Sequence, residues 1–122
     1  MKKILIVDDE EDLLMLLEQR LLANGYSVIK ATGGVEAIKL AKEKQPDLVL
    51  LDIWMPGVGG VEVAEALKAN QETKNIPIVF LTCLYTREDE RSKGHIIQGQ
   101  YFIAKPYDPQ ELLSEIKGRI GV

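Results

Sequence analysis

The sequence predicts an α/β protein with a five-stranded parallel sheet covered by helices on both faces. The clearest observation is the apolar run Leu48–Leu51, which is bounded by turn-forming residues and is typical of a strand buried on both faces. Short apolar runs rich in Ile, Leu and Val alternate with segments of helical periodicity, giving five strand–helix units. The connections between these units are short, and right-handed crossovers between parallel strands place helices on both sides of a sheet.

Each unit carries its own signals. The strands are expected at residues 4–7, 26–31, 48–51, 76–82 and 101–104, and the helices near 13–23, 35–45, 61–69, 86–94 and from 109 onward. The first helix should end at Asn24-Gly25, and the last should begin at Asp108 as its N-cap, followed by Pro109. The first two helices are expected to bury Leu13, Leu14, Leu17 and Leu21, and Val35, Ala37, Ile38 and Ala41, respectively. Residues 94–100 fit neither pattern.

Length and composition limit the class of protein. The 122 residues are expected to form one domain, spanning 1–122, with a core large enough to fold without cross-links. A formal net charge of -4 argues against direct binding to nucleic acid or to an anionic membrane. There is one cysteine, and no apolar run approaches the length of a membrane span or a signal peptide. These features predict a cytoplasmic protein.

Polar residues follow four of the predicted strands. Asp8 and Asp9 come after the first strand, Asp52 after the third, Thr82 at the end of the fourth and Lys105 after the fifth. The carboxyl ends of parallel strands share the edge of the sheet at which open α/β folds bind their ligands. The first turn lacks the glycine-rich phosphate loop of dinucleotide-binding and NTP-binding proteins.

The residue types at this edge indicate phosphoryl chemistry. Carboxylates that lie close together repel one another unless a cation intervenes, and few carboxylates with several waters are typical of Mg²⁺. A metal, the hydroxyl of Thr82 and the ammonium of Lys105 around one carboxylate suit a transferred phosphoryl group. The pattern therefore predicts that Asp52 is a nucleophile that forms an aspartyl phosphate, with Mg²⁺ as cofactor.

This set of residues resembles the response-regulator receiver domain of two-component signalling, over residues 2 to about 120. The resemblance is carried by Asp8-Asp9, by Asp52 within D-I-W-M-P-G, by Thr82 and by Lys105-Pro106. It implies a chemotaxis-regulator-like, flavodoxin-like (βα)5 three-layer sandwich with strand order 2-1-3-4-5. It also implies that Asp52 takes its phosphoryl group from a sensor histidine kinase or a histidine phosphotransfer protein. Such a domain is a switch and not a turnover enzyme, because it catalyses only its own phosphorylation and dephosphorylation.

The resemblance also implies a role for each site residue. The ligands of Mg²⁺, for which Mn²⁺ can substitute, would be Asp8, Asp9, Asp52 and the backbone carbonyl of Trp54. Thr82 and Lys105 would hold the phosphoryl oxygens, and the bond from Lys105 to Pro106 would be cis. Tyr101 would be an aromatic switch that turns inward when Thr82 moves toward the phosphate. The face formed by the fourth helix, fifth strand and fifth helix would then signal to a partner protein or an output domain.

Two other functions are compatible with this fold. One is a pseudo-receiver, an interaction module that is not phosphorylated, which only the unusual segment 94–100 favours. The other is an aspartyl-phosphate hydrolase of the haloacid-dehalogenase kind, which needs an acid two residues after the nucleophile, where this chain has Trp54. Taken singly, Asp8 and Asp9 could simply favour a helix N-terminus, and Tyr101 could be an ordinary strand aromatic. A dimer is compatible with the family, but segment 94–100 departs from the family pattern at the dimer surface, so no dimer mode is predicted.

Overall fold

The computed structural model describes residues 1–83, 87–94, 96–97 and 100–121. The strands are β1 (Lys3–Val7), β2 (Ser27–Ala31), β3 (Leu48–Leu51), β4 (Ile78–Thr82), β5 (Ile96–Ile97) and β6 (Gln100–Ala104). The helices are α1 (Glu11–Ala23), α2 (Gly34–Lys44), α3 (Gly60–Ala69), α4 (Arg87–Lys93) and α5 (Pro109–Ile120). The predicted first residue of the fourth helix, Thr86, lies outside the described residues, as does His95.

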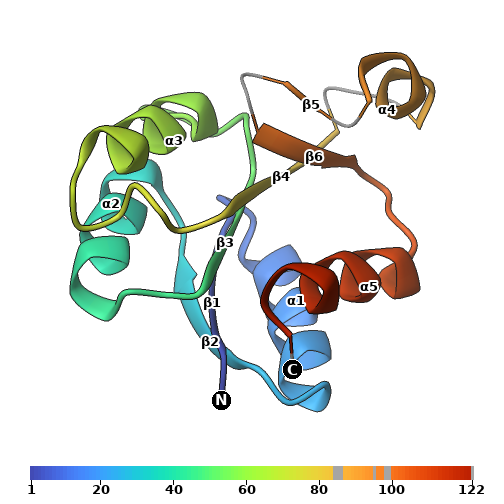
Figure 1. Cartoon of the computed structure of the whole chain (residues 1–122), viewed down its shortest axis with the longest axis horizontal. Coiled ribbons are helices and arrows are strands. Elements are labelled where there is room, and N and C mark those ends of the chain that lie inside the picture. The colour runs from blue at the N-terminus through green and yellow to red at the C-terminus, as the bar shows by residue number, and fades with distance from the viewer. Residues whose placement is uncertain (84–86, 95, 98–99, 122) are drawn as a thin grey trace.

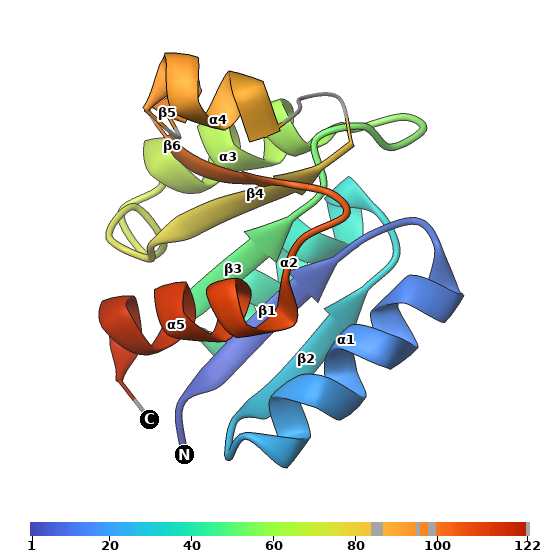
Figure 2. The same ribbon diagram turned by 90° about the vertical axis from the view of Figure 1, so that its right-hand side faces the viewer.

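A twisted sheet forms the middle layer, with α1 and α5 on one face and α2 and α3 on the other (Figures 1 and 2). Five parallel strands run in the order β2-β1-β3-β4-β6, which confirms the predicted order, with β6 as the fifth parallel strand. The three-layer α/β architecture predicted from the alternation of strands and helices is thus confirmed.

The structure adds one short strand that the sequence did not predict. β5 pairs antiparallel with the start of β6, with Ile96 opposite Tyr101 and Ile97 opposite Gln100. It comes from the segment 94–100 that fits neither helix nor strand periodicity, and it follows Gly94, which has a φ of 62°. Only two residues of β5 pair, which is too few to produce a recognisable alternation in the sequence.

Each face of the sheet has its own hydrophobic core, because alternate residues of a strand point to opposite faces. Under α2 and α3 the core includes Leu5, Val49, Phe80 and Phe102, all fully buried. Under α1 and α5 it includes Ile4, Leu50, Val79 and Ile103. Leu48–Leu51 supplies both cores, which confirms the prediction that this strand is buried on both faces.

Two of the predicted buried positions are wrong. In α1, Leu14, Leu17 and Leu21 are buried at a spacing of three and four, but Leu13 is 39% exposed. Leu13 lies about 100° around the helix from Leu14, and this places it at the border of the buried face. In α2, Val35 is 71% exposed, since it lies in the first turn of the helix, away from the buried alanines of that helix.

The helix ends follow the local sequence. The Asp108 side chain accepts a hydrogen bond from the N–H of Gln110 at 2.8 Å, and Pro109 is the first residue of α5, so the predicted N-cap is confirmed. Helix α1 ends at Ala23 with Asn24 as its C-cap, and Gly25 follows with a φ of 88°, a backbone conformation that favours glycine. The N-cap of α5 lies at the carboxyl edge of the sheet, whereas α1 ends at the opposite edge, just before β2.

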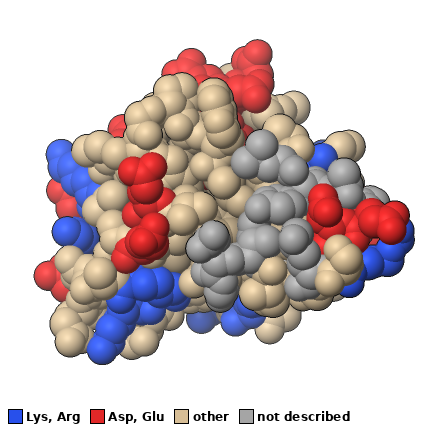
Figure 3. Space-filling view, turned by 90° about the horizontal axis from the view of Figure 1, so that it is seen from above, with Lys and Arg blue, Asp and Glu red and all other residues tan. Residues whose placement is uncertain are grey.

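No helix among the described residues is both long and apolar enough to cross a membrane. On the face seen in Figure 3, Lys and Arg side chains lie towards the margins, and among the residues described there they form no continuous basic patch in its middle.

Candidate functional site

The pairing of β1 with β3 brings two aspartates together. Val7 pairs with Leu51, so the residues that follow them, Asp8 and Asp52, leave the sheet side by side. The N–H of Asp52 donates to the Val7 carbonyl at 3.0 Å and extends the ladder by one hydrogen bond. The two carboxylates therefore meet because both strands end in aspartate at the same level of the sheet.

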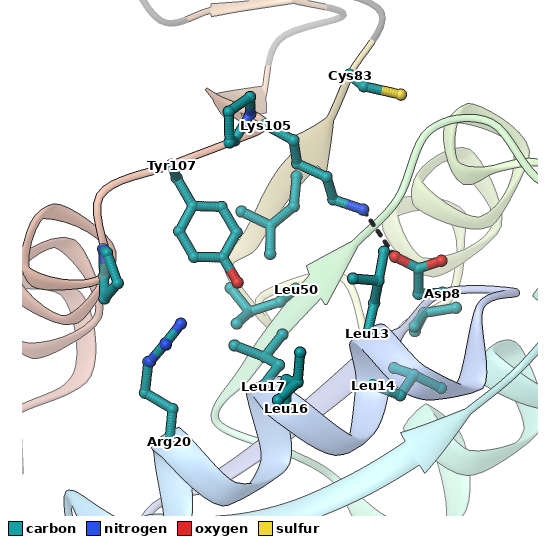
Figure 4. Close-up of a pocket in the computed structure, with 14 residues that line it drawn as sticks. Asp8, Leu13, Leu14, Leu16, Leu17, Arg20, Leu50, Cys83, Lys105 and Tyr107 are labelled. Atoms are coloured by element: carbon teal, nitrogen blue, oxygen red, sulfur yellow. Dashed lines mark hydrogen bonds and ion pairs between the residues drawn. The ribbon is translucent and has the colours of Figure 1, made fainter.

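Lys105 reaches this pair from the far side of β3. The last pair of β4 and β6 is Thr82 with Ala104, and the N–H of Lys105 donates to the Thr82 carbonyl at 2.8 Å. The Lys105 Nζ lies 2.7 Å from Asp8 Oδ2, the contact drawn in Figure 4, and 4.0 Å from Asp52 Oδ2. The ammonium thus neutralises part of the charge of both aspartates.

Asp9 completes a group of three carboxylates. One oxygen each from Asp8, Asp9 and Asp52 lies within 4.8 Å of the others. Asp8 and Asp52 are buried, whereas Asp9 is exposed, so the group opens to solvent on one side. Hard oxygen donors with room for water on one side are the ligand set that Mg²⁺ prefers. The residues present therefore fit the predicted metal.

The backbone holds both buried carboxylates in place. Asp8 Oδ1 accepts from the N–H of Glu10 at 3.0 Å, and Asp52 Oδ1 accepts from the N–H of Trp54 at 3.4 Å. Each aspartate therefore makes the local turn typical of Asx residues, with its second oxygen directed at the site. The first residue of α3, Gly60, packs against the Asp52 backbone so closely that a Cβ there would lie 2.2 Å from the Asp52 carbonyl oxygen.

The electrostatics single out Asp52. Burial raises the pKa of Asp52 to about 6, the nearby charges of Asp8 and Asp9 add to the rise, and Lys105 and the Trp54 N–H oppose it. Burial alone would lower the pKa of Lys105, but its hydrogen bond to Asp8 and the charge of Asp52 outweigh burial, so its pKa is raised. Lys105 is therefore charged at neutral pH, and burial makes ionisation of Asp52 less favourable than that of a carboxyl group in water.

Tyr101 is not directed at the site. Its hydroxyl donates to Glu115 Oε1 at 3.2 Å, and the guanidinium of Arg119 lies 4.4 Å from the centre of its ring. Arg119 also pairs with Glu115 at 3.6 Å, so the tyrosine joins β6 to two residues of α5. The ring packs against the core under α1 and α5.

This position corrects the predicted switch. Thr82 shares its face of β4 with Phe80, in the core under α2 and α3, because side chains two residues apart point the same way. Phe102 of β6 belongs to that same core, whereas Tyr101 points to the opposite face. An inward turn of Tyr101 toward Thr82 would have to pass through the sheet. The aromatic residue on the Thr82 face is Phe102, which the sequence analysis missed.

The loop after β6 has the expected backbone. The bond from Lys105 to Pro106 is cis, the isomer that the family resemblance implied. Trp54, in the loop after β3, is 63% exposed, so its indole lies in solvent beside the buried Asp52.

The comparisons with known proteins identify the family. The family model described as the response regulator receiver domain matches residues 4–117. The chain belongs to this family. Response regulator receiver domains act in two-component signalling and bind Mg²⁺ at an acidic site, which corresponds here to the group formed by Asp8, Asp9 and Asp52. They interact with histidine kinases and output domains, and they are not classical enzymes.

Two relatives align with nearly the whole of this chain. The polar-differentiation response regulator DivK of Brucella ovis is 36% identical over 122 residues, which cover 98% of this chain and 97% of the relative. The alkaline phosphatase synthesis transcriptional regulatory protein PhoP of Bacillus subtilis is 38% identical over 116 residues, or 95% of this chain. The match covers 47% of PhoP, so the chain spans about half the length of that relative.

Solved structures share the fold. The chemotaxis protein CheY4 of Vibrio cholerae matches with a TM-score of 0.82 and 28% identity over 98% of both chains. The receiver domain of a sensor histidine kinase of Pseudomonas aeruginosa PAO1 matches with a TM-score of 0.85 and 25% identity, over 99% of this chain and 98% of the other. That structure holds a magnesium ion coordinated in its active-site cleft.

Proposed function

We propose that this receiver domain is phosphorylated on Asp52 by a phosphohistidine of a sensor histidine kinase or a histidine phosphotransfer protein. The observation that carries the proposal is the convergence of Asp8, Asp9 and Lys105 on a buried carboxylate at the carboxyl edge of the sheet. Buried ion groups this dense are found where charge must be stabilised during a reaction.

In the transfer step, an Asp52 oxygen bonds to phosphorus as the bond from phosphorus to the donor histidine nitrogen breaks. The histidine nitrogen takes a proton from solvent, and Asp52 becomes an aspartyl phosphate. The raised pKa of Asp52, about 6, lies below neutral pH, so the carboxylate is mainly ionised and nucleophilic there. Later attack by water returns Asp52 to a carboxylate and releases phosphate.

The remaining site residues bind and orient the phosphoryl group. The ammonium of Lys105 pairs with one phosphoryl oxygen, and the Thr82 hydroxyl donates to another. Asp8, Asp9, Asp52 and the backbone carbonyl of Trp54 are the proposed ligands of Mg²⁺, with Mn²⁺ as a substitute. When bound, the cation supplies positive charge for the phosphoryl oxygens.

Phosphorylation changes the contacts of Thr82 and Lys105, and the proposed output is the face formed by α4, β6 and α5. On that face Tyr101 connects β6 to Glu115 and Arg119 of α5, so a shift of β6 reaches α5 through these contacts. The receptor of the signal is a partner protein or a linked output domain. The proposed compartment is the reducing cytoplasm, in keeping with the exposed free thiol of Cys83.

Acetyl phosphate, a small phosphodonor, tests this proposal without a partner protein. Intact mass spectrometry should detect one added phosphoryl group on the wild-type protein with Mg²⁺ and none after EDTA. Asp52→Asn should remain unlabelled, whereas Glu65→Gln, at an exposed carboxylate of α3, should label like the wild type. A wild-type protein that stays unlabelled with Mg²⁺ would favour the unphosphorylated interaction module instead.

A further inference from the structure

A short junction between β2 and α2, residues 31–34, lies against both loops that hold the buried aspartates. On one side, the N–H of Asp8 donates to the Ala31 carbonyl at 3.2 Å. On the other side, Gly34, the first residue of α2, packs against Val58 in the loop between β3 and α3. The junction contains none of the proposed metal ligands, yet it touches both of the loops that carry them.

Gly34 leaves no room for a side chain at this contact. A Cβ there would lie 2.4 Å from the Val58 carbonyl oxygen and 2.7 Å from Val58 Cγ1, and the first of these is a backbone atom that cannot rotate away. The neighbouring Gly33 differs, because it has an extended φ of -157° and a Cβ on it would meet no atom within 4 Å. Alanine therefore fits at residue 33, whereas at residue 34 it must displace the loop.

The loop that carries Val58 is fixed at both ends. At its start, the N–H of Trp54 donates to Asp52 Oδ1 at 3.4 Å. At its end, the N–H of Gly60 donates to the Ile53 carbonyl at 2.8 Å. A displacement of Val58 must therefore be absorbed by the backbone dihedrals of the residues between these two hydrogen bonds, and Trp54 is among them.

We propose that Gly34 is a positioning residue of the metal site, which acts through Val58 to fix the position of the Trp54 carbonyl. The inference rests on the proposed role of that carbonyl as a ligand of Mg²⁺. Because Mg²⁺ demands nearly ideal octahedral geometry, a small displacement of one ligand lowers the affinity for the cation. The effect of Gly34 is indirect, since its contact is with Val58 and not with a ligand.

A Mg²⁺ titration followed by the fluorescence of Trp54, the only tryptophan of the chain, tests the proposal. Gly34→Ala should bind Mg²⁺ at least roughly 10-fold more weakly, the loss typical of changes to a residue that orients a metal ligand. Gly33→Ala is the matched control and should bind Mg²⁺ as tightly as the wild type. Equal Mg²⁺ affinities for Gly34→Ala and the wild type would overturn the inference.

A second control separates positioning from a general loss of stability. Ile116 is buried in the core under α1 and α5, on the other face of the sheet, so Ile116→Ala destabilises the fold by leaving a cavity there. Its folded form should keep the wild-type affinity for Mg²⁺, because the loop between β3 and α3 is unchanged. A loss of Mg²⁺ affinity in Ile116→Ala as large as in Gly34→Ala would overturn the inference.

Hydrogen exchange of the wild-type protein tests the same contact without a substitution. Coupling between sites is reciprocal, so Mg²⁺ bound by the loop must also favour the contact of Val58 with Gly34. The amide of Ala37, which donates to the Gly33 carbonyl at 3.0 Å in the first turn of α2, should exchange roughly 5-fold more slowly with Mg²⁺. The amide of Gln45, hydrogen-bonded at the other end of the helix, should not change, since helix ends exchange by local opening.

The possible results separate this inference from the proposed function. A wild-type protein whose Trp54 fluorescence and hydrogen exchange do not respond to Mg²⁺ would overturn the proposed metal site and this inference with it. A wild-type protein that binds Mg²⁺ without slower exchange at Ala37, or with equal slowing at Ala37 and Gln45, would overturn this inference alone.

Discussion

Asp52 is an ionisable side chain held where ionisation is unfavourable. Its folded-state pKa of about 6 lies above the value of 3.8 for an unperturbed carboxyl, chiefly because of burial. Between these two pH values the folded protein binds a proton that the unfolded chain has released. The free energy of unfolding contributed by this group is therefore highest at low pH and falls as the pH rises from about 4 to about 6.

Asp52→Asn should remove this effect in metal-free protein. At pH 7 the variant should be more stable than the wild type by roughly 1 to 3 kcal/mol, and the difference should shrink towards pH 4. Urea unfolding in EDTA across this range measures it, with Glu65→Gln, an exposed carboxylate of α3, as the control. A stability difference that does not change with pH would contradict the proposed cost of ionising Asp52.

Lys105 and a divalent cation compete for the same oxygens. The Lys105 Nζ lies 2.7 Å from Asp8 Oδ2 and 4.0 Å from Asp52 Oδ2, so a cation placed among the carboxylates is repelled by the ammonium. Lys105→Met should therefore bind Mg²⁺ roughly 3- to 10-fold more tightly, yet accept phosphate from acetyl phosphate more slowly. Fluorescence of the exposed Trp54 can follow the Mg²⁺ titration, and Lys39→Met on α2 is the control. Weaker Mg²⁺ binding in Lys105→Met would show that Lys105 orders the carboxylates more than it repels the cation.

At the scale of elements, α3 is placed by its contact with the phosphoacceptor loop. A Cβ on Gly60 would lie 2.2 Å from the Asp52 carbonyl oxygen and 2.7 Å from the Ile53 Cα, both backbone atoms that cannot rotate away. The glycine therefore lets the start of α3 pack directly against the turn that holds the Asp52 side chain.

Gly60→Ala should push α3 away from this turn. We expect a loss of roughly 2 to 4 kcal/mol of stability and slower phosphorylation, since the Asp52 backbone must move. Gly118→Ala in α5, where a Cβ would meet no atom within 4 Å, should instead stabilise the protein by about 0.5 to 1 kcal/mol. Thermal unfolding and labelling of both variants measure these effects, and a Gly60→Ala protein as stable as the wild type would contradict the close packing.

The face of the sheet on which each aromatic residue of β6 lies could be predicted from the sequence only in part. The alternation of side chains along β6 places Tyr101 and Phe102 on opposite faces of the sheet, but it does not say which of them shares a face with Thr82. The answer depends on the register between β4 and β6, in which Thr82 pairs with Ala104. The switch assigned to Tyr101 was therefore wrong, because sequence spacing fixes faces within a strand and not between strands.

At the scale of the whole molecule, the three-layer architecture was predictable because every unit repeats the same signals, and right-handed crossovers place helices on both faces of a parallel sheet. The strand order, in which Asp8 and Asp52 end neighbouring strands, was implied by the family resemblance, because the hand of the crossovers alone leaves several orders open. The strand β5 could not be predicted, since two paired residues leave no periodicity. The exposure of Leu13 depends on the gap between α1 and α5, which is a property of the assembled fold.

The fold thus creates the site by joining distant segments: an acidic turn after β1, an aspartate after β3 and a lysine after β6. The most direct measurement is to locate the phosphoryl group after reaction with acetyl phosphate and Mg²⁺, by borohydride reduction of the acyl phosphate and peptide mass spectrometry. We predict that the reduced residue is Asp52 alone. Modification at Asp8, Asp9 or another residue, with Asp52 unchanged, would contradict the assignment of Asp52 as the phosphoacceptor.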